Sequence, residues 1–247
     1  MERHDQPPVA TFFAETALRE GADVDLGEHA AHHARVKRLS VGDVVFLTDG
    51  AGTRARSTIS AIRKSEVECR VERVDVHPAH PPMCVCVPIA DRDRMLWLGE
   101  KAAEFGVTMW QGVRFRRSLS VSPRGEGTAF AAKLRLRMIA ALEQSGGAWL
   151  PRVLPDTDLE GVAAPDGSPS IVFDATGRPL LSEFDRNADR GPRILFGPEG
   201  GIEPAELALL EANGWRRARL ASTTLRFETA GVAAIAVIRA AQLLNED

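Results

Sequence analysis

The chain has 247 residues, of which 44% are hydrophobic and 26% are charged, and its formal net charge is −3. This composition is ordinary for a globular protein and excludes one that is basic over its whole surface. No apolar run is long enough to cross a bilayer, and the polar first eight residues lack the apolar core of a signal peptide. We therefore expect a cytoplasmic protein that does not act in a membrane.

Cysteine and histidine limit the chemistry that the chain can carry. The spacing of Cys84 and Cys86 fits neither a redox pair nor a zinc finger, so we expect buried free thiols, as for Cys69. All six histidines lie within the first 80 residues. A Ser-His-Asp triad or a histidine-ligated metal within the C-terminal region is therefore excluded, and we expect no metal.

The first 76 residues are predicted to form a small β-barrel. Strands are expected at residues 9–13, 44–48, 54–62 and 67–71, and one helix at 27–39. Residues 77–82 contain three prolines, which remove backbone donors and fix an extended geometry. We therefore predict a first domain at 1–76, a linker at 77–82 and a second domain at 83–247.

The second domain is predicted to be an α/β domain with a mostly parallel sheet, because strands and helices alternate. Residues 155–170 are expected to be a loop, and the apolar closing helix is expected to be deeply buried. The predicted strands cover 83–89, 107–110, 171–174, 193–196 and 217–220, and the predicted helices cover 95–105, 130–144, 204–213 and 232–244.

Three of these strands end in segments suited to binding a ligand. Asp174 ends one strand, Gly197–Gly201 follows the next, and Leu220–Leu225 follows the last. Carboxyl ends of parallel strands form the usual ligand crevice of an α/β sheet, and glycines let the backbone approach a ligand closely. We expect the backbone groups of these segments to hold an adenine and a ribose.

The motifs Phe196–Gly201 and Leu225–Ala230 resemble those of the RsmE family. These SPOUT-class enzymes methylate N3 of a uridine in 16S ribosomal RNA with S-adenosylmethionine. Further matches at 32–43, 93–95 and 143–146 keep the family's order along most of the chain. The family's glycine and arginine before Leu225 are absent, since this chain has Leu220-Ala-Ser-Thr223.

The resemblance implies a fold, a cofactor and partners. The second domain would be a SPOUT domain with a trefoil knot, the first a PUA-like barrel, and the chain a homodimer acting on 16S ribosomal RNA of the small subunit. The positions implied to bind S-adenosylmethionine are Phe173, Asp174, Phe196, Gly197, Pro198, Glu199, Gly200, Gly201, Leu220, Ala221, Ser222, Thr224, Leu225, Arg226 and Thr229.

Two residues of the second motif are candidates for the chemistry. Uridine N3 carries a proton and becomes a nucleophile only when that proton leaves, so a cation and a carboxylate beside the ring would assist. We expect Arg226 to stabilise the developing anion and Glu228 to act as positioner or base. The alternative is that they pair with each other and tie the helix down. Glu199 could likewise contact the ribose or serve a helix N-terminus.

Basic residues suggest where RNA would bind. Residues 91–152 hold 11 Lys and Arg against 6 Asp and Glu, whereas residues 153–247 hold 9 against 15. Arginine suits phosphate geometry and histidine can stack on a base. An ordinary charged surface is the alternative reading. The candidate RNA-binding residues are His32, His33, Arg35, Arg38, Arg114, Arg116 and Arg117.

The sequence thus predicts an RNA methyltransferase that modifies N3 of a particular uridine in 16S ribosomal RNA. Two alternatives remain at this point. One is a SPOUT methyltransferase that acts on a ribose 2′-hydroxyl or another base, and the other is a catalytically inactive ribosomal RNA-binding scaffold.

Overall fold

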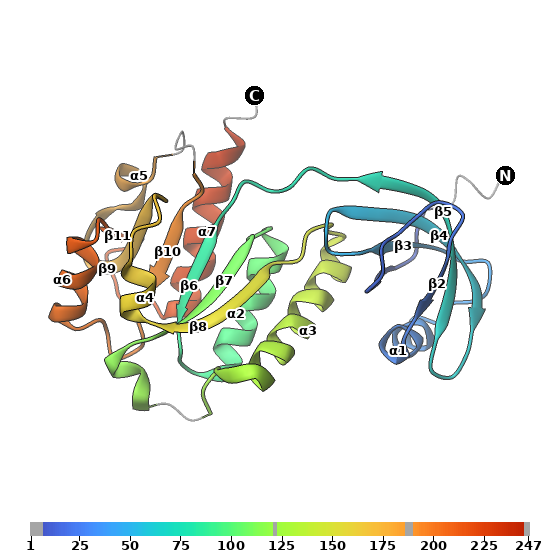
Figure 1. The fold of residues 1–247 in the computed structure, drawn as a ribbon, viewed down its shortest axis with the longest axis horizontal. Helices are drawn as coiled ribbons and strands as arrows, with labels where there is room; N and C mark the ends of the chain where they lie inside the picture. Colours follow the sequence, from blue (N-terminus) through green and yellow to red (C-terminus); the bar gives the residue numbers. More distant parts are fainter. Residues whose placement is uncertain (1–6, 121–122, 186–189, 245–247) are drawn as a thin grey trace. The chain divides into compact units, whose positions relative to one another are not determined.

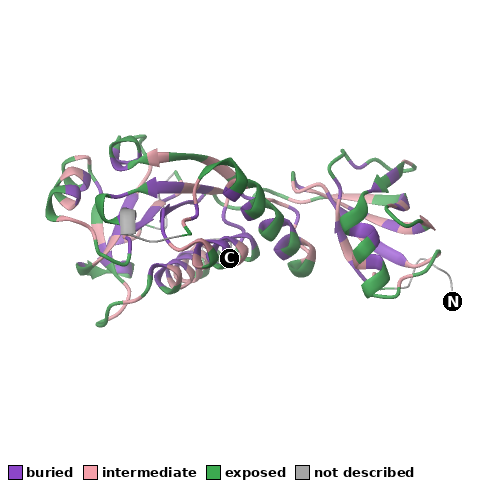
Figure 2. Cartoon of the chain, turned by 90° about the horizontal axis from the view of Figure 1, so that it is seen from below, coloured by how far each residue is buried: buried purple, intermediate pink, exposed green. Residues whose placement is uncertain are grey.

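A computed structural model describes residues 7–120, 123–185 and 190–244. The chain divides into two compact units, which are described separately. The first contains Met1–Ala79 together with Ile139–Leu150, and the second contains His80–Met138 together with Pro151–Asp247. In both units buried residues lie on the strands and also on helices (Figure 2).

The first unit is built on a curled five-stranded sheet with the order β1-β3-β4-β5-β2 (Figure 1). Strand β1 is parallel to β3, and the other neighbours are antiparallel. Strand β2 was not predicted from the sequence. The strands are β1 (Thr11–Phe13), β2 (Asp23–Leu26), β3 (Val44–Thr48), β4 (Thr53–Ile62) and β5 (Val67–Val76).

Helix α1 (Glu28–Val36) belongs to the first unit and buries three alanines, at positions 30, 31 and 34, in the core of that unit. Residues 139–150, which the predicted domain boundaries place with the second domain, complete this unit. Glu143 Oε1 accepts a hydrogen bond of 2.9 Å from Phe13 N, and Trp149 Nε1 donates one of 2.9 Å to Pro78 O. The contacts explain why this segment groups with the N-terminal strands.

The second unit has a six-stranded sheet, and all neighbouring strands in it are parallel. The order is β11-β9-β10-β6-β7-β8. This arrangement is consistent with the knotted SPOUT domain that the resemblance implies. The strands are β6 (Cys84–Pro88), β7 (Met109–Arg114), β8 (Arg152–Asp158), β9 (Ser170–Pro179), β10 (Arg193–Phe196) and β11 (Arg216–Arg219).

Helices complete the second unit, except that residues 139–145, at the end of one of them, belong to the first. Helix α2 packs against α7 through Leu98 and Gly231, where an added Cβ would lie 2.7 Å from the leucine. A separate apolar cluster joins Leu159 of α4 and Leu210 of α6 to Cys84 and Cys86, which are buried free thiols as predicted. The helices are α2 (Arg92–Glu104), α3 (Gly127–Ser145), α4 (Leu159–Ala163), α5 (Leu180–Glu183), α6 (Pro204–Ala212) and α7 (Phe227–Leu243), with a 3₁₀ turn at Arg116–Ser120.

Several elements of the second unit differ from the sequence-based expectation. The predicted loop at 155–170 contains most of β8 and all of α4, and β9 continues past Asp174 to Pro179. Strand β8 lies at the end of the sheet, where a proline such as Pro155 is tolerated. Helix α7 begins at Phe227 rather than at residue 232. No helix in the described part of the chain is both long and apolar enough to cross a membrane.

Candidate cofactor cavity

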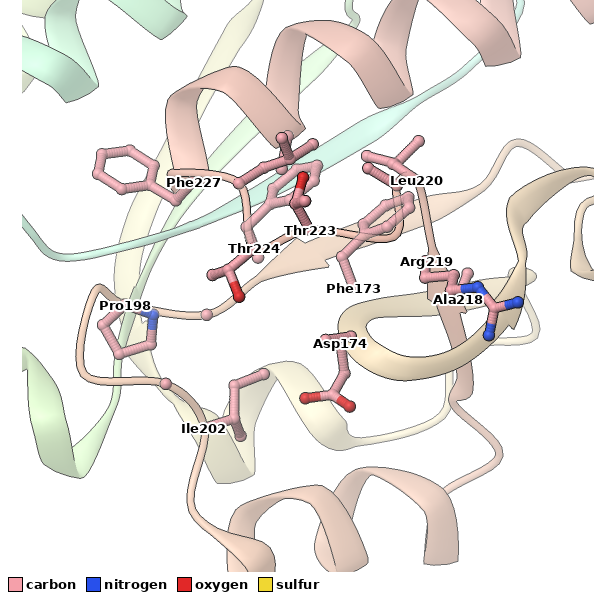
Figure 3. A pocket seen from close by; sticks show the side chains of 17 residues that line it. Phe173, Asp174, Pro198, Ile202, Ala218, Arg219, Leu220, Thr223, Thr224 and Phe227 are labelled. Carbon is pink, nitrogen blue, oxygen red and sulfur yellow. The ribbon is translucent and has the colours of Figure 1, made fainter.

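A cavity of about 290 Å³ lies in the second unit, between residues 173–175 inside β9 and the segments that follow β10 and β11. These three strands are neighbours in the sheet, so the segments lie close together. Figure 3 shows Pro198 and Ile202 on one side and Leu220 on the other, with Asp174 and Thr224 between them in this view. Phe173 and Phe196 stack with their ring centroids 4.9 Å apart.

An irregularity of β9 makes room for the cavity. Val172 pairs with Arg217, but the next residue of β11, Ala218, pairs with Arg178, so the intervening segment of β9 leaves the ladder. Asp174 Oδ1 closes a turn there by accepting a hydrogen bond of 2.9 Å from Thr176 N. At Gly177 an added Cβ would lie 2.6 Å from the carbonyl carbon of Ala218, which explains the glycine.

The loop after β10 contains a tight turn. Gly201 N donates a hydrogen bond of 2.8 Å to Pro198 O, and Gly201 has a φ of +75°, which favours glycine. Pro198, Gly201 and Ile202 line the cavity. Glu199 and Gly200 form the tip of the turn and do not line it.

Two arginines from other elements hold the turn. Arg117 Nη1 donates a hydrogen bond of 2.6 Å to Gly200 O, and its Nε lies 3.5 Å from Glu203 Oε1. Arg94 Nη1 lies 3.2 Å from Glu199 Oε1. The turn is therefore fixed through consecutive residues, Glu199 and Gly200, that are not among the residues lining the cavity.

Arg94 has a second carboxylate partner. Its Nε lies 3.8 Å from Glu228 Oε1, in the first turn of α7. The Glu228 side chain is 12% exposed, and its other oxygen, Oε2, is buried without a hydrogen-bond partner among the described residues. Sequence reasoning did not select Arg94. It lies in the matched segment 93–95, but nothing in that match indicated a partner or a role for its side chain.

Arg226 is the N-cap residue of α7, and its backbone carbonyl accepts a hydrogen bond from Ala230 N. Its side chain is exposed and has no hydrogen bond or ion pair to any described residue. The alternative in which Arg226 pairs with Glu228 therefore does not apply, since Glu228 contacts Arg94.

The structure gathers most, but not all, of the predicted cofactor positions. Those that line the cavity are Phe173, Asp174, Phe196, Gly197, Pro198, Gly201, Leu220, Ala221, Thr224 and Leu225. Those that do not are Glu199, Gly200, Ser222, Arg226 and Thr229. The lining also includes Ala175, Ile202, Ala218, Arg219, Thr223, Phe227 and Ala230, which are mostly apolar or part of the same loops and carried no separate sequence signal.

The candidate RNA-binding arginines of the second unit already contact carboxylates. Arg114 Nη1 lies 2.7 Å from Asp158 Oδ1, and this hydrogen bond raises the pKa of Arg114. Arg116 Nη1 lies 3.5 Å from Glu203 Oε2, yet 73% of its side chain is exposed. Arg116 is therefore the most accessible of the three.

The candidate residues of the first unit lie on α1 or just after it. His32 and Arg35 are exposed and stand three residues apart, so they share a face of the helix. His33 instead packs edge-on against Phe12, with ring centroids 5.3 Å apart, and its Nδ1 lies 3.9 Å from Glu143 Oε2. Arg38 is exposed and has a φ of +56°.

Within the described residues no group of three or more His, Cys, Asp and Glu side chains is arranged to hold a metal ion. The cavity has one carboxylate, Asp174, and one guanidinium, Arg219, in its lining. Its remaining walls are apolar or are formed by polar loops.

Two solved structures share this fold. A ribosomal RNA small subunit methyltransferase E from Neisseria gonorrhoeae, solved with S-adenosyl methionine, matches with a TM-score of 0.83 and 24% identity, over 94% of this chain and 97% of that one. A methyltransferase from Legionella pneumophila, solved with the same cofactor, matches with a TM-score of 0.84 and 23% identity, over 94% and 97%. These likenesses confirm the predicted fold class.

Sequence relatives and family models agree with the fold. Proteins named ribosomal RNA small subunit methyltransferase E are 28% identical in Mycobacterium tuberculosis, over 92% of this chain and 90% of the relative, and 25% identical in Bacillus subtilis, over 86% and 87%. The model of an RNA methyltransferase PUA domain matches residues 26–72, and the model of an RNA methyltransferase domain matches residues 78–239. The resemblance drawn from the sequence is thereby confirmed, and the chain belongs to the RNA methyltransferase family that the second model describes.

Proposed function

We propose that this RNA methyltransferase binds S-adenosylmethionine in the cavity between β9 and the loops after β10 and β11, and methylates N3 of a particular uridine in 16S ribosomal RNA. The observation that carries the proposal is the convergence of the irregular segment of β9 and the loops after β10 and β11 on one cavity in the second unit. The names of the relatives from M. tuberculosis and B. subtilis support the small-subunit RNA as substrate.

The residues of the cavity fit this cofactor. Its apolar walls, with Phe173 stacked on Phe196, suit an aromatic base, and the Asp174 carboxylate suits a ligand that carries positive charge. At Gly197 an added Cβ would lie 2.5 Å from Ile202 Cγ1, so only glycine leaves the wall in its present form. When bound, S-adenosylmethionine supplies a methyl group attached to a positively charged sulfur.

The chain's own residues supply positioning and charge. The uracil ring must lose the N3 proton as the bond from N3 to the methyl carbon forms, and the ring carries negative charge while this happens. Arg226, whose side chain is exposed and unpaired among the described residues, stabilises that charge. Glu228, in the first turn of α7, positions the base or accepts the proton.

The RNA is proposed to bind through residues of both units. In the first unit these are His32, His33, Arg35 and Arg38, although the contacts of His33 make it a less accessible member. In the second unit they are Arg114, Arg116 and Arg117. Exposed arginines that meet phosphates make binding weaker as the salt concentration rises.

The protein is also proposed to be a homodimer. Helix α7 keeps half-buried apolar residues such as Val232 and Val237, and Trp97 on α2 is 45% exposed. Light scattering after size-exclusion chromatography should give twice the chain mass of 26.8 kDa. A mass of one chain at micromolar concentration would contradict the dimer.

One experiment tests substrate, atom and cofactor together. Small ribosomal subunits that lack the modification are incubated with the protein and labelled S-adenosylmethionine, and the RNA is digested to nucleosides. We expect the label in 3-methyluridine. Label in a ribose-methylated nucleoside or another base would overturn the proposed specificity, and RNA binding without any label or cofactor binding would indicate an inactive scaffold.

A further inference from the structure

We propose that Arg94 is a positioning residue that joins two walls of the cofactor cavity. One wall is the turn Pro198–Gly201, and the other is the start of α7. Arg94 reaches the first through Glu199 and the second through Glu228. The inference rests on the proposed function, because it assigns a role at the same site.

The geometry of the Arg94 contacts suits a fixed bridge. The Nη1 to Glu199 Oε1 distance is 3.2 Å and the Nε to Glu228 Oε1 distance is 3.8 Å, so two different nitrogens of one planar group serve two carboxylates. All three side chains are only 12–35% exposed. The planar guanidinium group of arginine carries several N–H donors and can make both contacts at once, whereas the single ammonium of lysine is a point charge.

Arg94 is itself held in place. It lies in the first turn of α2, where its backbone N–H donates a hydrogen bond of 3.0 Å to the Asp91 side chain. The next residue, Met95, is fully buried. The bridge therefore starts from a capped helix end packed in the core rather than from a loop.

Each arm of the bridge has its own consequence for the site. Glu199 stands at the tip of the turn whose other residues, Pro198 and Gly201, line the cavity, so this arm sets the cavity wall. The arm to Glu228 occupies Oε1 and leaves Oε2 as the oxygen without a partner. Arg94 thereby fixes the orientation of the Glu228 carboxylate in the first turn of α7.

The two arms predict different kinetic effects. Glu199→Gln should raise the Kd for S-adenosylmethionine about tenfold, the size expected for one charge-assisted contact, while the single-turnover rate at saturating cofactor stays within about twofold. Arg94→Gln should raise the Kd by a similar factor and also lower the saturating rate at least about tenfold, because both arms are lost. The double variant should bind cofactor no more weakly than Arg94→Gln alone.

The experiment combines calorimetry of cofactor binding, single-turnover methyl transfer and thermal unfolding. Arg137→Gln, an exposed arginine on α3, is the matched control and should change none of these. Arg94→Lys keeps the charge but has a single ammonium group. It should therefore restore part of the affinity for S-adenosylmethionine or part of the saturating rate, but not both. If Arg94→Gln lowers Tm but leaves the Kd and the saturating rate unchanged, Arg94 has only a structural role and the inference is overturned. Additive effects of Arg94→Gln and Glu199→Gln on the Kd would also overturn it. If wild-type protein binds no cofactor, the proposed function fails first and the inference falls with it.

Discussion

Glu143 and His33 form a titratable pair in the core of the first unit. Burial raises the pKa of Glu143, although the hydrogen bond from Phe13 N and the charges of His29 and Lys37 oppose the change. Burial also lowers the pKa of His33, assisted by the nearby charge of Lys37. Both shifts mean that the fold favours the neutral form of each side chain.

The pKa shifts of the pair predict a dependence of stability on pH. The stabilising contribution of Glu143 to the free energy of unfolding is complete below its ordinary pKa of 4.5. It is lost as the pH rises through the pKa of the folded state. The stabilising contribution of His33 is complete above pH 6.5, its ordinary pKa, and is lost as the pH falls through the pKa of the folded state. Glu143→Gln keeps an oxygen that can accept the hydrogen bond from Phe13 N, but it cannot ionise, so at high pH it avoids the cost of a buried negative charge.

We therefore expect the free energy of unfolding of Glu143→Gln, relative to wild type, to be more favourable at pH 8 than at pH 5. Urea unfolding at both pH values measures this difference. Glu160→Gln, at an exposed position, serves as the control and should show no such trend. A difference that does not change with pH would contradict the assignment.

Arg38 stands in a backbone conformation that favours glycine. Its φ is +56°, directly after the end of α1, and Leu39 N donates a hydrogen bond of 2.9 Å to Ala34 O across it. An arginine in this left-handed position costs roughly 1–2 kcal/mol compared with glycine. Arg38→Gly should therefore raise the free energy of unfolding by about 1 kcal/mol while it weakens RNA binding.

The Arg38 prediction is checked by urea unfolding and by RNA affinity at several salt concentrations. If Arg38 meets a phosphate, the slope of log affinity against log salt should fall by about one. Arg38→Asn, which tolerates the same backbone conformation without a charge, should give the same loss of slope. An unchanged slope in both variants would remove Arg38 from the RNA-binding set.

At the scale of elements, the departure of β9 from its ladder with β11 shapes the cavity. Gly177 lies where the backbone of Ala218 comes within 2.6 Å of an added Cβ, and backbone atoms cannot rotate away as a side chain can. Gly177→Ala should thus separate β9 from β11, cost roughly 1–3 kcal/mol of stability and weaken cofactor binding. Calorimetry and urea unfolding measure both effects. Gly27→Ser, where an added Cβ meets nothing within 4 Å, should leave cofactor binding unchanged.

Regular elements were the easiest part of the fold to predict from the sequence. Strands β3 and β10 match the predicted residues 44–48 and 193–196, because both are short apolar runs bounded by turn residues. Strands β2 and β8 were missed. Both lie at the end of a sheet and carry acidic residues. Strand β2 alternates acidic and apolar residues but is only four residues long, and β8 contains Pro155.

The parts of the site that are formed by continuous segments could be predicted from the sequence. The contacts between residues that are distant in sequence could not. Glycines and strand ends indicated the loops around Asp174, Gly197 and Leu220. The contacts of Glu199 and Glu228 are with Arg94, which is more than 100 residues from either in sequence. A single sequence shows charges but not which of several arginines lies opposite a given carboxylate.

At the scale of the whole molecule, the first unit depends on a segment that is distant in sequence. Trp149 donates to Pro78 O, and its ring fills the space beside Gly52, where an added Cβ would lie 2.3 Å from Cζ2. Trp149→Ala removes this packing and should lower the free energy of unfolding by about 2 kcal/mol, a reduced value because the tryptophan is only half-buried. Urea unfolding measures the loss, and Leu136→Ala at an exposed position is the control. A loss no larger than that of the control would show that the segment is dispensable.

The same division of the chain has a consequence for its synthesis. Residues 139–150 belong to the first unit, yet they are translated after the whole of His80–Met138. The N-terminal strands therefore leave the ribosome well before the segment that completes their core. The first unit stays incompletely folded while part of the second unit is being synthesised. The first unit begins to fold before the second, but it can complete its folding only after part of the second unit has been synthesised.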